Sequence, residues 1–433
     1  MALDYSHRCS DAVIRFTDKS GAPLAEQTIK ADLRNHEFLF GCGATEAEWL
    51  ADPVTQEQLD RMAAEGRKNM GDRITADMPT ADTLNKLAEE RYQKWLKLFN
   101  YGTLHVYWGR FEPERGKPQT ERTMRAAKML HRDGVQVKGH PLIWHTVTAP
   151  WLLDMTDDEI LTECLNRVER DVTAFKGQID MWDVINEVVI MPIFDKYDNG
   201  ITRLCNKLGR FGIVREMFQK ARECNPDATL LINDFNTTQA YEVLIEGLLE
   251  MGVPIDVIGI QSHQHQGFWG LEKLEQVLKR FERFGLPIHF TENTFVSGKI
   301  MPPEIDDLND YVVDDWPSTP EGEARQAKDW YDMYTTLFSH PLVKGITAWD
   351  FTDGGWLGAP SGIIRRDGSI KPAYETLDKL INQDWHTTVE LRTNADGVAK
   401  LSGFRGEYAF SAGDKTGSVK LTENMGETKV VLE

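Results

Sequence analysis

Residues 228–236 read Ala228-Thr-Leu-Leu-Ile-Asn-Asp-Phe-Asn236, an apolar run that ends in polar side chains. Uninterrupted apolar runs are typical of parallel strands buried on both faces, whereas half-exposed strands alternate apolar and polar residues. Seven further segments share this character, so the sequence predicts eight core strands. In chain order they cover residues 36–41, 103–108, 136–144, 180–187, 228–236, 255–265, 286–295 and 344–351.

Helical patterns lie between the predicted strands, for example at residues 121–132, 160–175, 213–224, 271–284 and 322–338. Repeated strand-then-helix units predict an α/β protein built as a closed (β/α)8 TIM barrel. The main alternative is an open doubly wound sheet, which normally carries a glycine-rich phosphate loop after its first strand. Gly41-Cys-Gly-Ala44, followed by an acidic stretch, does not fit such a loop. We therefore expect the barrel.

The two ends of the chain have a different pattern. Residues 10–40 alternate apolar and polar side chains around a turn, and residues 386–433 contain short β-like runs separated by turn residues. We expect three parts, 1–36, 37–385 and 386–433. In this division the middle part is the barrel, and the two ends pack together as a small β-sandwich beside it.

Composition excludes several classes of protein. The chain has 433 residues, 41% hydrophobic and 27% charged, which is enough for a large buried core. Its formal charge of −19 disfavours nucleic acid and anionic membranes as partners. No apolar run approaches the length of a membrane-spanning helix, so we expect no membrane insertion. The five cysteines form no CxxC pair and are expected to be ordinary thiols.

Two predicted connections are unusually long, at residues 188–212 and 296–321. Long loops after barrel strands usually shape a binding face. Both are acidic and could supply calcium ligands, but neither has the full spacing of a known calcium loop. We therefore expect solvated loops and no metal site.

Chemically useful side chains recur at the ends of the predicted strands, where a barrel places its catalytic groups. Glu187 and Glu292 end the fourth and seventh strands. Hydrolysis of a glycosidic bond needs two carboxyl groups, one protonated and one ionised. Aromatic faces suited to sugar rings and polar groups suited to sugar hydroxyls end the same strands. These are Trp182, Trp349 and Trp356, and His140, Asn186 and Gln261.

The motifs at these strand ends resemble those of glycoside hydrolase family 10, the retaining endo-β-1,4-xylanases. The most specific is Met181-Trp-Asp-Val-Ile-Asn-Glu187, which resembles the acid/base signature of the family. Five others occur in the same order along residues 37–385. They are Gly139-His-Pro-Leu-Ile-Trp-His145, Leu231-Ile-Asn-Asp-Phe-Asn236, Gly259-Ile-Gln-Ser-His263, Phe290-Thr-Glu292 and Gly345-Ile-Thr-Ala-Trp-Asp-Phe-Thr-Asp353 with Trp356.

This resemblance implies roles for individual residues. Glu187 would be the general acid/base and Glu292 the nucleophile, and the charge of Glu292 should raise the pKa of Glu187. The family pattern implies no metal or organic cofactor and a carbohydrate substrate, namely xylan, a xylo-oligosaccharide or a β-glycoside. The substrate-binding residues implied are His140, Trp144, Asn186, Gln261, His263, Trp349 and Trp356, with His263 also hydrogen-bonded to Glu292.

The resemblance also suggests a secreted or periplasmic protein. Met1-Ala-Leu-Asp-Tyr has no signal-peptide pattern, so a cytoplasmic location stays open.

The second predicted strand departs from the family. Xylanases of the family carry Glu, Asn and Lys there to hold the next glycone sugar, at positions that fall on Thr103, Leu104 and Tyr107 in this chain. Two alternatives to an endo-xylanase therefore stay open. One is an exo-acting or aglycone-selective β-glycosidase, and the other is a carbohydrate-binding protein without activity.

Overall fold

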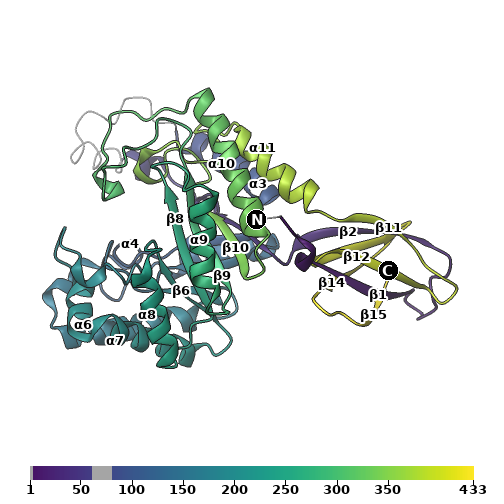
Figure 1. The fold of residues 1–433 in the computed structure, drawn as a ribbon, viewed down its shortest axis with the longest axis horizontal. Coiled ribbons are helices and arrows are strands. Elements are labelled where there is room, and N and C mark those ends of the chain that lie inside the picture. The colour runs from purple at the N-terminus through teal and green to yellow at the C-terminus, as the bar shows by residue number, and fades with distance from the viewer. Residues whose placement is uncertain (1–2, 61–79) are drawn as a thin grey trace.

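The computed structural model describes residues 3–60 and 80–433. Eight parallel strands close into a barrel in the order β10-β3-β4-β5-β6-β7-β8-β9 (Figure 1). The predicted TIM barrel is therefore confirmed. The strands are β3 (Leu39–Gly43), β4 (Tyr101–His105), β5 (Gln136–His140), β6 (Met181–Asn186), β7 (Thr229–Asp234), β8 (Val257–Gln264), β9 (Ile288–Phe295) and β10 (Val343–Ala348).

Helices follow the barrel strands and cover the outside of the barrel. The described helices are α1 (Thr45–Ala51), α3 (Ala81–Leu98), α4 (Trp108–Phe111), α5 (Thr120–Arg132), α6 (Asp157–Ala174), α7 (Gly200–Cys224), α8 (Gln239–Glu250), α9 (Leu271–Glu282), α10 (Pro320–Phe338) and α11 (Pro372–Lys379). Their first turns carry the expected signals: Thr156 and Glu159 form a capping box on α6, and Thr319 caps α10 ahead of Pro320.

The connection after β6 is shorter than the sequence predicted. Residues 200–212 were expected in a loop, but α7 begins at Gly200, where the Asn199 side chain accepts a hydrogen bond from the Thr202 amide. The helix continues across a break at Gly209, whose φ is 70°. The glycines in this stretch argue against a helix from sequence alone, whereas burial of Ile201 and Leu204 stabilises one.

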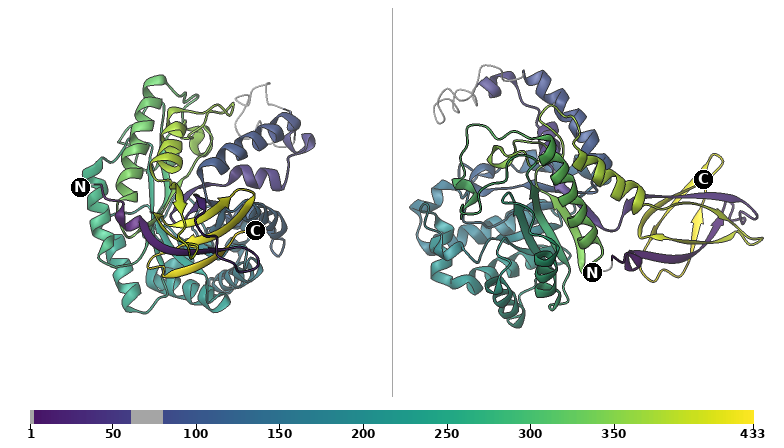
Figure 2. Two further views of the ribbon diagram at one scale, coloured as in Figure 1. Left: turned by 90° about the vertical axis from the view of Figure 1, so that its right-hand side faces the viewer. Right: turned by 45° about the horizontal axis from the view of Figure 1, so that its top comes forward.

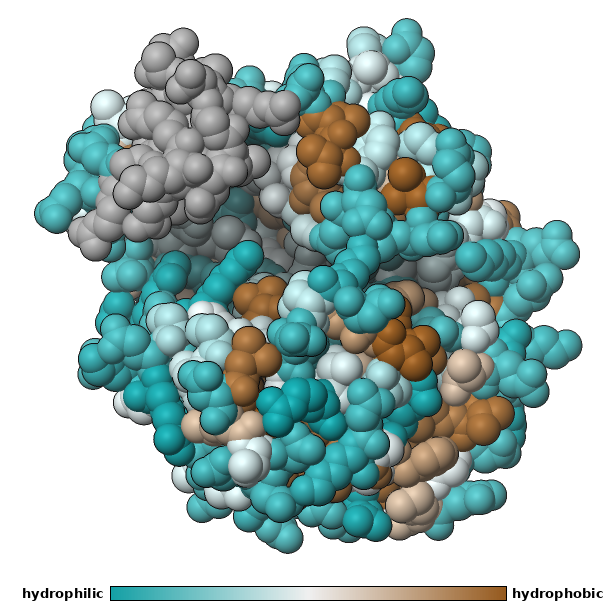
Figure 3. Space-filling model, turned by 90° about the vertical axis from the view of Figure 1, so that its left-hand side faces the viewer, coloured by the Kyte–Doolittle hydropathy of each residue, from teal (hydrophilic) through white to brown (hydrophobic). Residues whose placement is uncertain are grey.

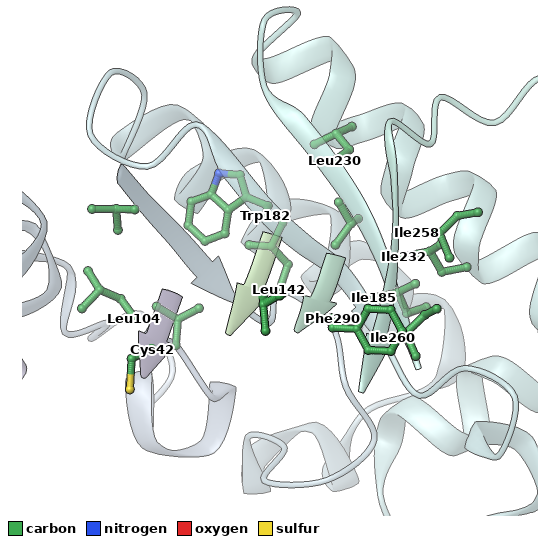
Figure 4. Packing of buried hydrophobic residues seen from close by; sticks show 14 of the residues in the cluster. Cys42, Leu104, Leu142, Trp182, Ile185, Leu230, Ile232, Ile258, Ile260 and Phe290 are labelled. Atoms are coloured by element: carbon green, nitrogen blue, oxygen red, sulfur yellow. The ribbon is translucent and has the colours of Figure 1, made fainter. Parts of the chain in front are cut away.

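Trp182 is part of the hydrophobic core, which corrects its interpretation as a sugar-binding face. Its side chain has no exposed surface, and its indole N–H donates to the carbonyl of Ile179. Its ring lies where a Cβ on Gly139 would come within 2.1 Å, so the glycine on β5 makes room for it. Figure 4 shows the indole among aliphatic side chains of the barrel strands.

The chain ends form two further sheets, with strand orders β12-β1-β15 and β11-β2-β13-β14. Apolar side chains from both sheets, such as Phe16 and Phe410, pack in a core separate from that of the barrel. The strands are β1 (Cys9–Thr17), β2 (Thr28–His36), β11 (Thr388–Arg392), β12 (Val398–Phe404), β13 (Gly406–Ala412), β14 (Lys415–Leu421) and β15 (Glu427–Val431).

These sheets lie at the end of the barrel where its strands begin, and the loops that follow the strands lie at the other end (Figures 1 and 2). The buried Arg8 guanidinium holds the junction by donating to the carbonyls of Phe338, His340 and Val343 at the end of α10 and the start of β10. The accessory sheets therefore lie far from the strand ends that carry the predicted site. Within the described ranges, no helix is both long enough and apolar enough to cross a bilayer.

Candidate active site

The predicted site residues gather near the ends of β5, β6, β8, β9 and β10. Figure 3 shows the side of the molecule that faces away from the accessory sheets. This face is hollowed across its middle. Side chains from strands far apart in the sequence meet here because parallel barrel strands all end on the same rim.

Glu187 directly follows β6 and is held by three neighbours. Its Oε2 accepts a hydrogen bond from the Trp144 indole at 2.8 Å, and its Oε1 accepts from Gln261 at 3.2 Å and from Asn186 at 3.4 Å. Its backbone has φ 55°, a left-handed conformation that is costly for a residue with a Cβ. A hydrogen bond from the Glu187 amide to the carbonyl of Asn233 at 2.8 Å stabilises this turn. In this conformation the carboxyl group reaches side chains that follow β5 and lie on β8.

The environment of Glu187 favours the protonated acid. Burial, and next the negative charge of Glu292, raise its pKa from 4.5 to about 8. The hydrogen bonds from Trp144 and Gln261 favour the ionised form but do not outweigh these effects. The rise expected from Glu292 is therefore present, although burial is the larger cause.

Glu292 lies on β9 with Gln261 of β8 as its partner in the register. His263 Nε2 lies 2.9 Å from its Oε2, and Asn233 donates to its Oε1 at 2.7 Å. Burial alone would raise the pKa of Glu292, but the positive charge of His140 and the bond and charge of His263 hold it below its ordinary value. Glu292 is therefore the ionised member of the pair.

A buried chain of polar groups supports the His140 ring. His140 Nδ1 lies 2.7 Å from Asp183 Oδ2, and Lys138 Nζ lies 2.5 Å from the same oxygen. The other ring nitrogen, Nε2, lies 3.8 Å from Glu292 Oε1. Lys138 and Asp183 have no exposed side-chain surface, so this ion pair fixes the imidazole beside the carboxylate.

Asn233 joins the two carboxyl groups, a role that the sequence analysis did not assign to it. Its amide donates to Glu292 and, at 2.8 Å, to the Asn186 oxygen. Gln261 donates to that same Asn186 oxygen at 3.0 Å and also to Glu187. The sequence signal that could have found it is its place near the end of the predicted strand 228–236. Its position opposite Asn186 of β6 comes from the barrel register and appears only in the structure.

Trp349 and Trp356 complete one side of the site. The Trp349 ring lies 5.2 Å from that of His140, and the Trp356 ring lies 4.5 Å from that of His263. Apart from the corrected Trp182, every substrate-binding residue predicted from the sequence therefore contacts Glu187 or Glu292, or contacts a residue that does.

The second barrel strand, β4, is where the sequence departs from the family, and the structure shows how its residues lie. Thr103 and Leu104 are fully buried in the barrel wall and cannot reach a ligand. His105 is partly exposed, and Glu48 of α1 accepts hydrogen bonds from its backbone amide at 2.8 Å and lies 3.1 Å from its ring Nδ1. Glu48 and His105 are polar residues at this rim that the sequence analysis missed.

The two acidic loops are joined to each other. Lys196, after β6, lies 2.7 Å from both Asp307 and Asp310, after β9. The Trp356 indole also donates to Asn309 of the second loop at 3.3 Å. A lysine ammonium thus neutralises part of the acidic run, and no cluster of three metal-binding side chains occurs among residues 3–60 and 80–433.

Comparison with known proteins identifies the family of the chain. Residues 73–379 match the sequence profile of Glycosyl hydrolase family 10. Endo-1,4-beta-xylanase B of Thermotoga neapolitana is 28% identical over 298 residues, which is 64% of this chain and 78% of the relative. Anti-sigma-I factor RsgI6 of Acetivibrio thermocellus is 25% identical over 409 residues, which covers 92% of this chain but only 44% of that longer protein.

Solved structures agree in fold. Native xylanase 10B from Thermotoga maritima superimposes with a TM-score of 0.57 at 24% identity, covering 69% of this chain and 90% of that one. A family 10 structure from Paenibacillus barcinonensis gives a TM-score of 0.59 at 20% identity, with 80% and 95% covered. With the profile matching most of the barrel and the two carboxyl groups at its strand ends, the chain belongs to glycosyl hydrolase family 10.

Proposed function

We propose that the protein is a retaining glycoside hydrolase that cleaves β-glycosidic bonds in xylan-like substrates. The observation that carries the proposal is the unequal pair of carboxyl groups. Glu187 has a pKa of about 8, so it is protonated at neutral pH, while the pKa of Glu292 is held low. An acid and a nucleophile of this kind are what the double-displacement mechanism requires.

In the first step, Glu187 protonates the glycosidic oxygen while Glu292 attacks the anomeric carbon. The bond to the leaving group breaks as the bond to Glu292 forms, through an oxocarbenium-like transition state. In the second step, Glu187 is a carboxylate and removes a proton from water, which attacks the anomeric carbon and releases Glu292. Loss of the Glu292 charge in the intermediate lowers the proton affinity of Glu187 between the two steps.

The substrate class is inferred from the relatives and from the shape of the site. Several relatives are named endo-1,4-beta-xylanases, and the site places indole rings beside amide and imidazole groups suited to a sugar. We further propose that residues 37–385 are the catalytic unit and that residues 1–36 and 386–433 form one accessory sandwich. A polymeric substrate would require action outside the cytoplasm, because intact xylan does not enter the cell.

The test is hydrolysis of xylan, an aryl β-xyloside and an aryl β-xylobioside, with Glu292→Ala as the control. We expect turnover of at least one substrate by the parent and none by the variant. Proton NMR of the first product should show the β-anomer, since two displacements retain configuration. An α-anomer as the first product, or equal activity of Glu292→Ala, would contradict the proposed mechanism.

A second candidate is a carbohydrate-binding protein without turnover. It is favoured by one observation: the relative that aligns with 92% of this chain is named as an anti-sigma factor and not as an enzyme. The two candidates separate in the same experiment. Sugar binding by the parent without hydrolysis of any substrate would support the binding protein.

A further inference from the structure

Tyr107 lies against both side chains that position the carboxyl groups. It follows β4 at the start of α4, and its ring lies 5.7 Å from that of His140 and 5.5 Å from that of Trp144. His140 lies beside Glu292, and Trp144 donates to Glu187. A single side chain therefore lies between Tyr107 and each carboxyl group: His140 toward Glu292, and Trp144 toward Glu187.

The ring of Tyr107 is held firmly in this place. His105 stacks on it at 5.4 Å with an interplanar angle of 23°, and Glu48 holds His105 through its amide and its imidazole. On another side, the Arg110 guanidinium lies 5.7 Å from the ring centroid. A planar side chain packed on several sides acts as a fixed wall, because moving it would break all of these contacts.

The hydroxyl group of Tyr107 is available to a ligand. No residue in the described part of the chain forms a hydrogen bond with it. Burial raises the pKa of this phenol well above 10, and the negative charge of Glu292 adds to the effect. The phenol thus stays protonated and can donate a hydrogen bond beside the reacting pair.

Tyr107 also belongs to the half of the barrel rim where β10, β3, β4 and β5 end. Trp349 of β10 contacts His105 at 5.2 Å, and β10, β3, β4 and β5 are consecutive in the barrel. Ring contacts therefore run from Trp349 through His105 and Tyr107 to His140, which also contacts Trp349 directly. The neighbouring Thr103 and Leu104 have no exposed surface, so neither presents a side chain to a ligand.

We propose that Tyr107 closes the glycone side of the site behind a single sugar and donates its hydroxyl to that sugar. This inference rests on the proposed function and makes it narrower: the substrate is a β-glycoside whose glycone is one terminal sugar. Tyr107 is thus a specificity-determining residue, backed by the His105–Glu48 pair.

The test compares kcat/KM for an aryl β-xyloside and an aryl β-xylobioside in three proteins: the parent, Tyr107→Phe and Tyr107→Ala. The parent should prefer the xyloside. Tyr107→Phe keeps the wall and should keep this preference, while kcat/KM falls about tenfold, near the upper end for one neutral hydrogen bond. Tyr107→Ala opens the wall and should shift the ratio toward the xylobioside by about tenfold or more.

Tyr331→Phe and Tyr331→Ala are the matched controls, because this tyrosine is 46% exposed on the outer helix α10. Both should behave like the parent, and thermal unfolding checks that every variant is folded. A parent that prefers the xylobioside would contradict the proposal that Tyr107 closes the glycone side. So would a Tyr107→Ala variant whose ratio of kcat/KM for the two substrates equals that of the parent. Parent-like kcat/KM values in Tyr107→Phe would contradict the proposed hydrogen bond from the Tyr107 hydroxyl to the sugar.

Binding separates this inference from the proposed function. Calorimetric titration with xylose and with xylobiose should show a larger gain in affinity from the second sugar in Glu292→Ala/Tyr107→Ala than in Glu292→Ala, because any binding on the aglycone side is common to both proteins. If the parent hydrolyses nothing, the proposed function fails and the titration still decides whether Tyr107 is the wall. An equal gain in affinity from the second sugar in the two proteins would contradict the proposal that Tyr107 closes the glycone side.

Discussion

Replacing Glu187 with glutamine should stabilise the protein at neutral pH while it abolishes hydrolysis of unactivated substrates. A carboxyl group whose pKa is 4.5 in the unfolded chain and about 8 in the folded one binds its proton more tightly in the folded state. Its contribution to stability is complete below pH 4.5 and is lost as the pH rises toward 8. Glutamine cannot ionise, so Glu187→Gln removes this loss.

The size of the effect follows from the two pKa values. The interval from 4.5 to about 8 corresponds to about 5 kcal/mol when fully developed, since one pKa unit is worth about 1.4 kcal/mol. Between pH 5 and pH 7 the free energy of unfolding of the parent should fall by about 2.5 kcal/mol relative to the variant. Comparison with the variant cancels the groups that titrate equally in both proteins.

Urea unfolding at pH 5, 6 and 7, followed by tryptophan fluorescence, measures this difference. Glu390→Gln is the matched control, because Glu390 is an exposed carboxyl on β11 in the accessory sheet, and it should follow the parent at every pH. Parallel stability curves for the parent and Glu187→Gln would refute the reasoning. They would show that Glu187 is already ionised near neutral pH and is not poised as an acid.

Three further changes test other parts of the site. His263→Ala removes a partner that lowers the pKa of Glu292, so the acidic limb of the kcat/KM profile should move to higher pH, and an unmoved limb would contradict this role. Trp182→Ala should destabilise the fold by about 3–5 kcal/mol, measured by urea unfolding, because it empties a buried site; a cost below about 1 kcal/mol would argue against a core position. Lys196→Ala should change the free energy of unfolding by less than about 1 kcal/mol, because its ion pairs are partly exposed. It should nevertheless speed proteolysis within residues 296–319, and an unchanged rate of cleavage would count against the link between the two loops.

The barrel could be predicted because its signal is local. Each core strand is a short apolar run with polar residues at its end. A strand buried on both faces can therefore be recognised from its own residues, without knowing which strand lies beside it. The first half of α7 was missed for the opposite reason. Its glycines weaken the local signal, and the helix exists because Ile201 and Leu204 find a buried partner surface.

The site divides in the same way. Glu187 directly follows β6 and Glu292 lies in the second half of β9. Both could be found from their places near the ends of predicted strands, and their motifs resembled a family. The link through Asn233 depends on the register between β6 and β7, which the sequence does not state. The His105–Glu48 pair needs α1 to fold back over β4, a tertiary arrangement without a sequence pattern. The left-handed backbone at Glu187 likewise carries no sequence signal.

The central claim is that Glu292 forms a covalent bond to the sugar while Glu187 serves as acid and base. Its most direct test is to incubate the protein with an activated 2-fluoro-β-xyloside, which slows the second step more than the departure of a good leaving group, and to map the product by peptide mass spectrometry. The account predicts one fluoroglycosyl group on Glu292, absent from Glu292→Ala. A label on another residue, or an unlabelled protein that still turns over substrate, would contradict it.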